Sequence, residues 1–219
     1  MNAILENRQA TLFFIYLAIL LTALLGQDIL LEPFGGQAFG MPVQETTRIT
    51  SVWGLFTLVA LLVAGALERR TSKRKVAAWG GWVALLGFGL IALSGLLVNS
   101  SIFYTGVVLL GVGTGLATVS NLALMLDMTT AGKVGLFIGA WGMSNAISRL
   151  TGSVISGAVR DTLNRVLPNP IMAYVVVFGI MAALILISLM LLRRIDVTAF
   201  REQAEKTPLI ERAALAGEA

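Results

Sequence analysis

The sequence predicts an all-α integral membrane protein, and three observations lead to this fold class. The chain of 219 residues is 57% hydrophobic and only 13% charged, whereas an ordinary soluble domain carries about 25% charged residues. Its mean hydropathy is +0.85. The apolar residues gather in runs long enough to cross a bilayer, which takes about 20 residues of helix. A water-soluble globule of this length would need more polar surface than the sequence supplies.

Six apolar runs are predicted to form transmembrane helices within a single domain, residues 1–195. Residues 76–126 hold no charged side chain and are too long for one helix, so the polar triplet at 99–101 is expected to form a tight hairpin. Residues 196–219 are mixed in charge, which favours a loosely ordered cytoplasmic tail. The six predicted spans are residues 10–31, 49–67, 76–98, 102–126, 134–159 and 171–192.

The positions of Lys and Arg predict that both termini are cytoplasmic. If six spans alternate in direction, one side of the membrane receives twelve of the 16 basic residues, and the other side receives Arg48, Arg160 and Arg165. Basic residues accumulate on the cytoplasmic side of membrane proteins. The segment ERRTSKRK between the second and third spans is the main basic loop, and it contains Glu68, Arg69, Arg70, Lys73, Arg74 and Lys75.

Missing residue types exclude several classes of function. The chain has no Cys, and therefore no disulfide, thiolate nucleophile or Cys-ligated metal; it has no His, the commonest general base and metal ligand. We therefore expect neither enzymatic activity nor a metal site. The net charge of +4 comes from basic residues set between apolar runs, so the expected surroundings are the lipid bilayer and no nucleic-acid partner is predicted.

Polar residues interrupt the end of the first span. Gln27, Asp28 and Glu32 fall at membrane depth, where a plain exit loop needs no charge. Pro33 and the glycine pair after it predict that the helix breaks here and that the chain changes direction. Two interpretations stay open: an interfacial turn with solvated acids, or an intramembrane polar site.

The fifth span carries Arg149 within a row of small residues. At 100° per residue this row forms a stripe about 80° wide, and small residues let another helix approach closely in lipid. An unpaired arginine near mid-membrane costs about 3 kcal/mol, so Arg149 is expected to face protein or an internal cavity. The stripe predicts close helix packing at Gly135, Gly139 and Gly142.

Depth in the membrane indicates which anion pairs with Arg149. At 1.5 Å per residue, Arg149 lies about 22 Å and Asp28 about 27 Å from the inner ends of their spans. Glu32 is the alternative partner, and Gln27 and Asn145 are further polar candidates. An Asp28–Arg149 pair could be a gate or ligand anchor, or an ion pair that only fixes helix packing; both interpretations stay open.

The fourth span contains the glycine-rich segment GVGTG at residues 111–115. As a nucleotide-binding motif it is very weak, because it lies inside an uncharged span and not between a strand and a helix. Gly111 and Gly115 instead predict a small-residue packing face.

The arrangement and the wording of several segments resemble known membrane proteins. Six spans, cytoplasmic termini, a basic second-to-third loop and an interrupted first helix are similar to one half of a twelve-span major facilitator fold. The longer motifs resemble the signature of the PucC family, of which the chain matches the C-terminal six-helix half. These motifs are QDILLEPFGGQAFGM at 27–41, ETTR at 45–48, GLATVSNLALMLDMT at 115–129 and GLFIGAWGMSNAISR at 135–149.

The resemblance implies a function, partners and a location. PucC proteins are transporter-like proteins of phototrophic bacteria that are needed to assemble light-harvesting antenna complexes. The chain is then expected to be a membrane assembly factor that meets antenna polypeptides and (bacterio)chlorophyll in an inner, intracytoplasmic or thylakoid membrane. A second six-helix half is also implied, as a partner chain, a second copy or an N-terminal half that this chain lacks.

Two other functions remain as alternatives. The first is half of a major-facilitator-type secondary transporter that uses the Asp/Arg pair. The second, an enzyme of pigment synthesis, is weakest because the chain has no D-x-x-x-D cluster for a Mg²⁺-diphosphate.

Pigment handling would require an oxygen ligand for Mg²⁺, which prefers oxygen, and aromatic side chains against the ring. The candidate pigment-contact residues are Asn121, Trp141, Phe137 and Trp53. Aromatic residues in membrane spans also pack against other helices or form interfacial belts, so this second interpretation stays open. The sequence assigns no resident cofactor beyond (bacterio)chlorophyll as a candidate.

Overall fold

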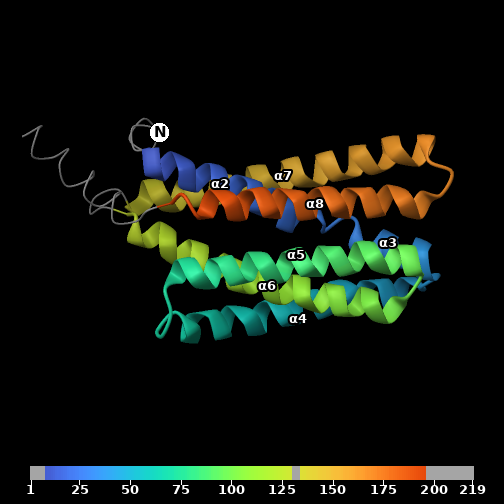
Figure 1. Ribbon diagram of the computed structural model, residues 1–219, viewed down its shortest axis with the longest axis horizontal. Coiled ribbons are helices and arrows are strands. Elements are labelled where there is room, and N and C mark those ends of the chain that lie inside the picture. The colour runs from blue at the N-terminus through green and yellow to red at the C-terminus, as the bar shows by residue number, and fades with distance from the viewer. Residues whose placement is uncertain (1–7, 130–133, 196–219) are drawn as a thin grey trace, which may run out of the picture.

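Seven helices form the described part of the chain, residues 8–129 and 134–195. They are drawn in Figure 1, a computed structural model in which long helices run side by side along one axis. The helices are α2 (Arg8–Gly26), α3 (Leu31–Phe39), α4 (Val43–Leu67), α5 (Lys73–Leu97), α6 (Ser100–Asp127), α7 (Val134–Val166) and α8 (Pro170–Leu192).

Five of the described helices, α2, α4, α5, α6 and α8, are long and apolar enough to cross a membrane. The predicted all-helical architecture is thus present in the described residues. The fifth predicted span lies in α7, which has 33 residues but is not among these five, because Ser, Thr, Asn and Arg recur along it. The predicted tail, residues 196–219, lies outside the described residues.

The first predicted span ends earlier than the sequence suggested. Helix α2 ends at Gly26, and a turn closed by hydrogen bonds from the Leu30 and Leu31 amides to the Gln27 carbonyl leads into α3. The predicted break is therefore present, but Pro33 does not cause it. Pro33 lies in the first turn of α3, where its missing N–H breaks no helical hydrogen bond.

The predicted hairpin at residues 99–101 is confirmed. Val98 adopts a left-handed conformation with φ of 51°, and the Asn99 side chain caps α6 by accepting hydrogen bonds from the amides of Ser101 and Ile102. Such a cap replaces helical bonds that the first N–H groups lack. The two helices then pack closely along their length.

The bundle has two groups of helices joined by α3 and by contact between α5 and α8. Helix α6 packs between α4 and α5, and α2 packs with α7 and α8 (Figure 1). Phe34 of α3 inserts between the groups, with ring centroids 5.5 Å from Phe103 and 5.2 Å from Phe178. The start of α2 and the end of α8 lie at the same end of the bundle (Figure 1).

Candidate functional site

The predicted ion pair between Asp28 and Arg149 is present. The Arg149 Nη2 atom lies 3.2 Å from Asp28 Oδ2, and the two side chains are 62% and 29% exposed. Gln27 Nε2 donates a hydrogen bond of 3.0 Å to the other carboxylate oxygen. Gln27 itself is 1% exposed, and its Oε1 has no hydrogen-bond partner among the described residues. A buried amide therefore holds the carboxylate in place.

Close packing of α2 on α7 brings the pair together. The backbones of Gly26 and Gly152 touch, so that a Cβ added to Gly26 would lie 2.9 Å from the Gly152 carbonyl carbon. On either side of this contact, Ser148 Oγ donates to the Ala18 carbonyl at 3.1 Å and Ser156 Oγ donates to the Gly26 carbonyl at 2.8 Å. Asp28 leaves the end of α2 beside the turn of α7 that carries Arg149.

The sequence analysis did not identify the row Ser148, Gly152 and Ser156 as the packing face of α7. The stripe that it predicted does not pack against another described helix of this chain at its first three glycines. Gly135, Gly139 and Gly142 are exposed, and no other described residue lies within 4 Å of the place where their Cβ would stand. The row that packs, S-x-x-x-G-x-x-x-S at residues 148–156, lies beside the predicted stripe. Its four-residue spacing was a usable signal, but helical periodicity alone does not say which row of small residues meets a neighbour.

Arg149 was expected to face protein or an internal cavity. Within this chain its side chain lies on the outer edge of the α2–α7 contact, with more than half of its surface exposed. Because a guanidinium has five N–H donors in a planar fork, one carboxylate leaves donors free.

The alternative acid, Glu32, has a different partner. Thr50 Oγ1 of α4 donates a hydrogen bond of 2.6 Å to Glu32 Oε1. Glu32 thus ties α3 to α4 and leaves Asp28 as the partner of Arg149. Asn145, the other polar candidate on α7, donates through Nδ2 to the Trp141 carbonyl of its own helix.

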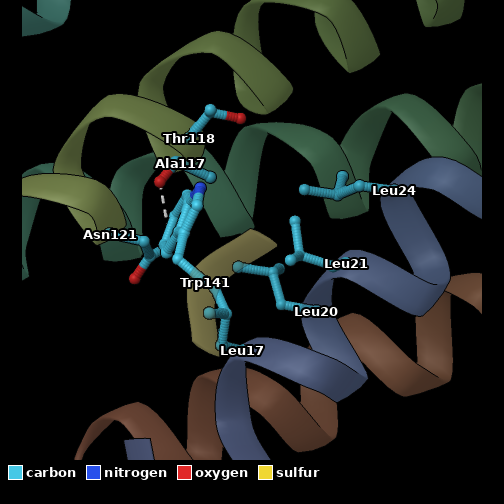
Figure 2. A pocket seen from close by; sticks show the side chains of 8 residues that line it. All are labelled: Leu17, Leu20, Leu21, Leu24, Ala117, Thr118, Asn121 and Trp141. Atoms are coloured by element: carbon cyan, nitrogen blue, oxygen red, sulfur yellow. Dashed lines mark hydrogen bonds between the residues drawn. The ribbon is translucent and has the colours of Figure 1, made fainter. Parts of the chain in front are cut away.

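Two of the four predicted pigment-contact residues share a small pocket (Figure 2). Asn121 of α6 and Trp141 of α7 line it with leucines of α2, and the space between these side chains has no room for a water molecule. Asn121 is 1% exposed; its Nδ2 donates to the Ala117 carbonyl at 2.8 Å, and its Oδ1 has no partner in the described ranges. Drug-sized ligands occupy pockets of about 300–1,000 Å³, so this pocket cannot enclose a chlorin ring as it stands. Its lining is Leu17, Leu20, Leu21, Leu24, Ala117, Thr118, Asn121 and Trp141.

The other two aromatic candidates lie elsewhere. Phe137 is 4% exposed, and its ring centroid lies 6.2 Å from that of Phe14. Trp53 belongs to the α4–α6 contact, where its carbonyl lies against Gly111. The structure therefore does not bring the four predicted residues into one site.

The predicted packing face of α6 is confirmed. A Cβ on Gly111 would lie 2.6 Å from the Trp53 carbonyl oxygen, and one on Gly115 would collide with the Thr57 carbonyl. Thr57 Oγ1 also donates to the Gly111 carbonyl at 3.2 Å. Both glycines are needed for α4 to approach α6.

Half of the basic segment belongs to a helix. Glu68, Arg69 and Arg70 lie after the end of α4, whereas residues 73–75 form the first turn of α5. Lys73 Nζ lies 2.7 Å from Asp127 Oδ1 at the end of α6, and Arg74 donates to the Arg193 carbonyl at the end of α8. These bonds join three helix ends at one end of the bundle.

No metal centre is evident where the structure describes the chain. Residues 8–129 and 134–195 contain no group of three or more Asp, Glu, His or Cys side chains placed to hold a metal ion.

Three relatives are similar to this chain over part of their length. Protein PucC of Rhodovulum sulfidophilum is 36% identical over 137 residues, which is 62% of this chain and 30% of the relative. The bacteriochlorophyll synthase 44.5 kDa chain of Rhodobacter capsulatus is 26% identical over 193 residues, 84% of this chain and 44% of the relative. An uncharacterized MFS-type transporter, Rv1250 of Mycobacterium tuberculosis, is 31% identical over 118 residues, 52% of this chain and 19% of the relative.

The chain thus spans less than half the length of these relatives. The family model described as "PUCC protein" matches residues 1–200. This range includes every described helix and the Asp28–Arg149 pair. The chain therefore belongs to the PUCC protein family.

Proposed function

We propose that this chain is a six-helix membrane unit of an assembly factor for photosynthetic light-harvesting antenna complexes. The observation that carries the proposal is the family match over residues 1–200. Relatives named PucC and a relative named as a bacteriochlorophyll synthase chain, all from phototrophic bacteria, support it. The membrane would then be the photosynthetic membrane of such a bacterium, with antenna polypeptides and (bacterio)chlorophyll as partners.

In this proposal α7 is the sixth span, and both termini are cytoplasmic. Helix α7 runs beside α8 along the bundle (Figure 1), and at 1.5 Å per residue its 33 residues exceed the thickness of a hydrocarbon core. The position of both described ends at one end of the bundle supports an even number of crossings. The accumulation of Lys and Arg at that end supports a cytoplasmic location.

A second six-helix half is part of the proposal. Helix α7 buries few of its residues inside this chain, and its exposed surface combines apolar side chains with Arg149. Lipid tails are a poor environment for a guanidinium, so a protein surface is the better cover. That surface could belong to a partner chain, to a second copy, or to sequence that precedes this half in a longer protein.

The proposed role is non-enzymatic. The unit would present a membrane groove to antenna polypeptides and pigment without converting a substrate. Because the pocket at Asn121 has no room for a ligand, we place pigment contact on the outer surface of α2, α6 and α7. Trp141 is partly exposed and remains a candidate contact there, whereas contact with Asn121, which is 1% exposed, would require the helices around it to move apart.

Deletion of the gene for this chain in its phototrophic host tests the proposal. We expect the near-infrared absorbance of the antenna to fall while solute uptake stays unchanged, and we expect the tagged protein to co-purify with antenna polypeptides. Normal antenna absorbance in the deletion strain would refute the proposal.

Half of a secondary transporter is the second candidate. The similarity to an MFS-type transporter and the Asp28–Arg149 pair favour it, because such pairs occur in ion and proton relays. Gradient-dependent flux that is lost in Asp28→Asn, with a normal antenna, would support this candidate and not the first.

A further inference from the structure

An exposed basic patch lies where α5 begins and α8 ends. Arg74 and Lys75 lie in the first turn of α5, and Arg193 and Arg194 directly follow α8. All four side chains are exposed. The hydrogen bond from Arg74 to the Arg193 carbonyl brings the two segments together, so the four cations form one patch.

Among the described residues, few acidic side chains lie at this end of the bundle. In the part of the chain that the structure describes, this end of the bundle has two of them, Glu68 after α4 and Asp127 at the end of α6. Asp127 pairs with Lys73, the basic residue next to the patch. Like charges held close together repel each other unless an anion lies between them, so the patch is complementary to an anionic ligand.

Next to the patch, further from the end of the bundle, α5 and α8 form an apolar surface. Leu189 of α8 packs against Gly81 of α5: its Cδ2 atom lies 2.7 Å from the position that a Cβ on Gly81 would occupy. Beside this contact, Trp82 of α5 is 43% exposed and Met190 of α8 is 57% exposed. At 100° per residue, Trp82 lies within about 80° of Arg74 around α5.

Cations above and apolar side chains below match the two parts of a phospholipid. Both helices are apolar enough to cross a membrane, so their shared end lies at the depth of the headgroups. Basic pockets between transmembrane helices on the cytoplasmic side bind phosphate-rich headgroups such as that of cardiolipin. We propose that the α5–α8 end binds an anionic phospholipid, with its phosphates at the basic patch and an acyl chain along Trp82 and Met190.

Native mass spectrometry of the purified protein in detergent, titrated with lipids, tests this proposal. We expect cardiolipin to bind at least tenfold more tightly than phosphatidylcholine. Each basic residue near an anionic membrane surface contributes about a fivefold change in affinity. The double variant Arg193→Gln/Arg194→Gln should therefore weaken cardiolipin binding about thirtyfold.

The matched control is Arg69→Gln/Arg70→Gln, which removes the same charge from the same end of the bundle but from the α4–α5 turn. We expect a change of less than threefold. Equal losses in the two double variants would overturn the proposal, because they would indicate diffuse attraction to the whole basic end. If the first double variant does not fold, Arg194→Gln alone should still weaken binding about fivefold.

Two competition measurements identify the ligand. Inorganic phosphate should not displace cardiolipin, because it has no acyl chain; displacement would reassign the patch to a free anion and overturn the proposal. A glutamate-rich peptide should not compete either. Preferential binding of that peptide, or equal binding of cardiolipin and phosphatidylcholine, would also overturn the proposal.

Discussion

At the scale of single residues, Arg149 and Asp28 form an ion pair at the outer edge of the α2–α7 contact. The guanidinium has one carboxylate 3.2 Å away, and the carboxylate is itself fixed by the buried Gln27 amide. Among the described residues, Asp28 thus has two polar partners, Arg149 and Gln27, whereas the Arg149 guanidinium has one, Asp28.

Charge reversal tests this pair. Asp28→Arg or Arg149→Asp alone places two like charges together, and each is expected to lower stability by up to about 3 kcal/mol. The double reversal should recover most of the loss, because it restores opposite charges at the same two positions. Thermal unfolding of the purified variants in detergent measures all three.

Arg165→Asp is the matched control for the charge change, since Arg165 is exposed near the end of α7. We expect it to unfold at nearly the wild-type temperature. A double reversal that is no more stable than the worse single variant would contradict the pairing.

At the scale of elements, the α2–α7 contact depends on two glycines and two serine hydroxyls. A Cβ on Gly152 would lie 2.5 Å from the Thr22 carbonyl oxygen. Because that atom is backbone, it cannot swing aside as a side chain could. The contact therefore tolerates no larger residue without a shift of one helix.

Gly152→Ala is predicted to destabilise the protein by about 1–3 kcal/mol, the usual cost of overpacking. Gly139→Ala on the same helix is the control, because nothing described lies within 4 Å of its Cβ position. It should be neutral or stabilising by up to about 1 kcal/mol, since Ala favours helix more than Gly does. Chemical unfolding of both variants in detergent provides the comparison. Equal effects would show that α7 does not pack on α2 through this row.

The sequence predicted those features of the helices that depend on neighbouring residues in one segment. The hairpin at Asn99 and the α6 packing face at Gly111 and Gly115 follow from a polar triplet and a four-residue spacing. The pairing of Asp28 with Arg149 followed from depth, because helices rise by a fixed length per residue. The face of α7 that packs on α2 could not be predicted from the sequence, because α7 has several rows of small residues and only contact with another helix distinguishes them.

The same limit applies to the predicted pigment contacts. Trp53, Phe137 and Trp141 are all aromatic residues within helices, and composition alone groups them. They lie on two helices, α4 and α7, and make different contacts: Trp53 joins the α4–α6 contact and Trp141 the α2–α6–α7 pocket. Which aromatic residues meet is a property of helix order, which the spacing within one helix does not encode.

At the scale of the whole molecule, the two ends of the bundle differ in charge. One end carries the basic segment and Arg193-Arg194, while the other carries Glu32, Glu45 and Asp161 with fewer cations. This difference predicts orientation. The prediction that both described ends face the cytoplasm also requires α7 to cross the membrane, because only a sixth crossing returns the end of α8 to the side on which α2 begins.

Cysteine labelling tests the crossing of α7 directly, and the natural chain offers a clean background because it has no Cys. Single cysteines are placed at Ser72→Cys in the α4–α5 turn, Ser100→Cys in the α5–α6 hairpin and Pro168→Cys between α7 and α8. An impermeant maleimide added outside intact cells should label the second and third variants, and Ser72→Cys only after the membrane is opened. If Pro168→Cys instead behaves like Ser72→Cys, then α7 does not span the membrane and the six-helix unit is wrong.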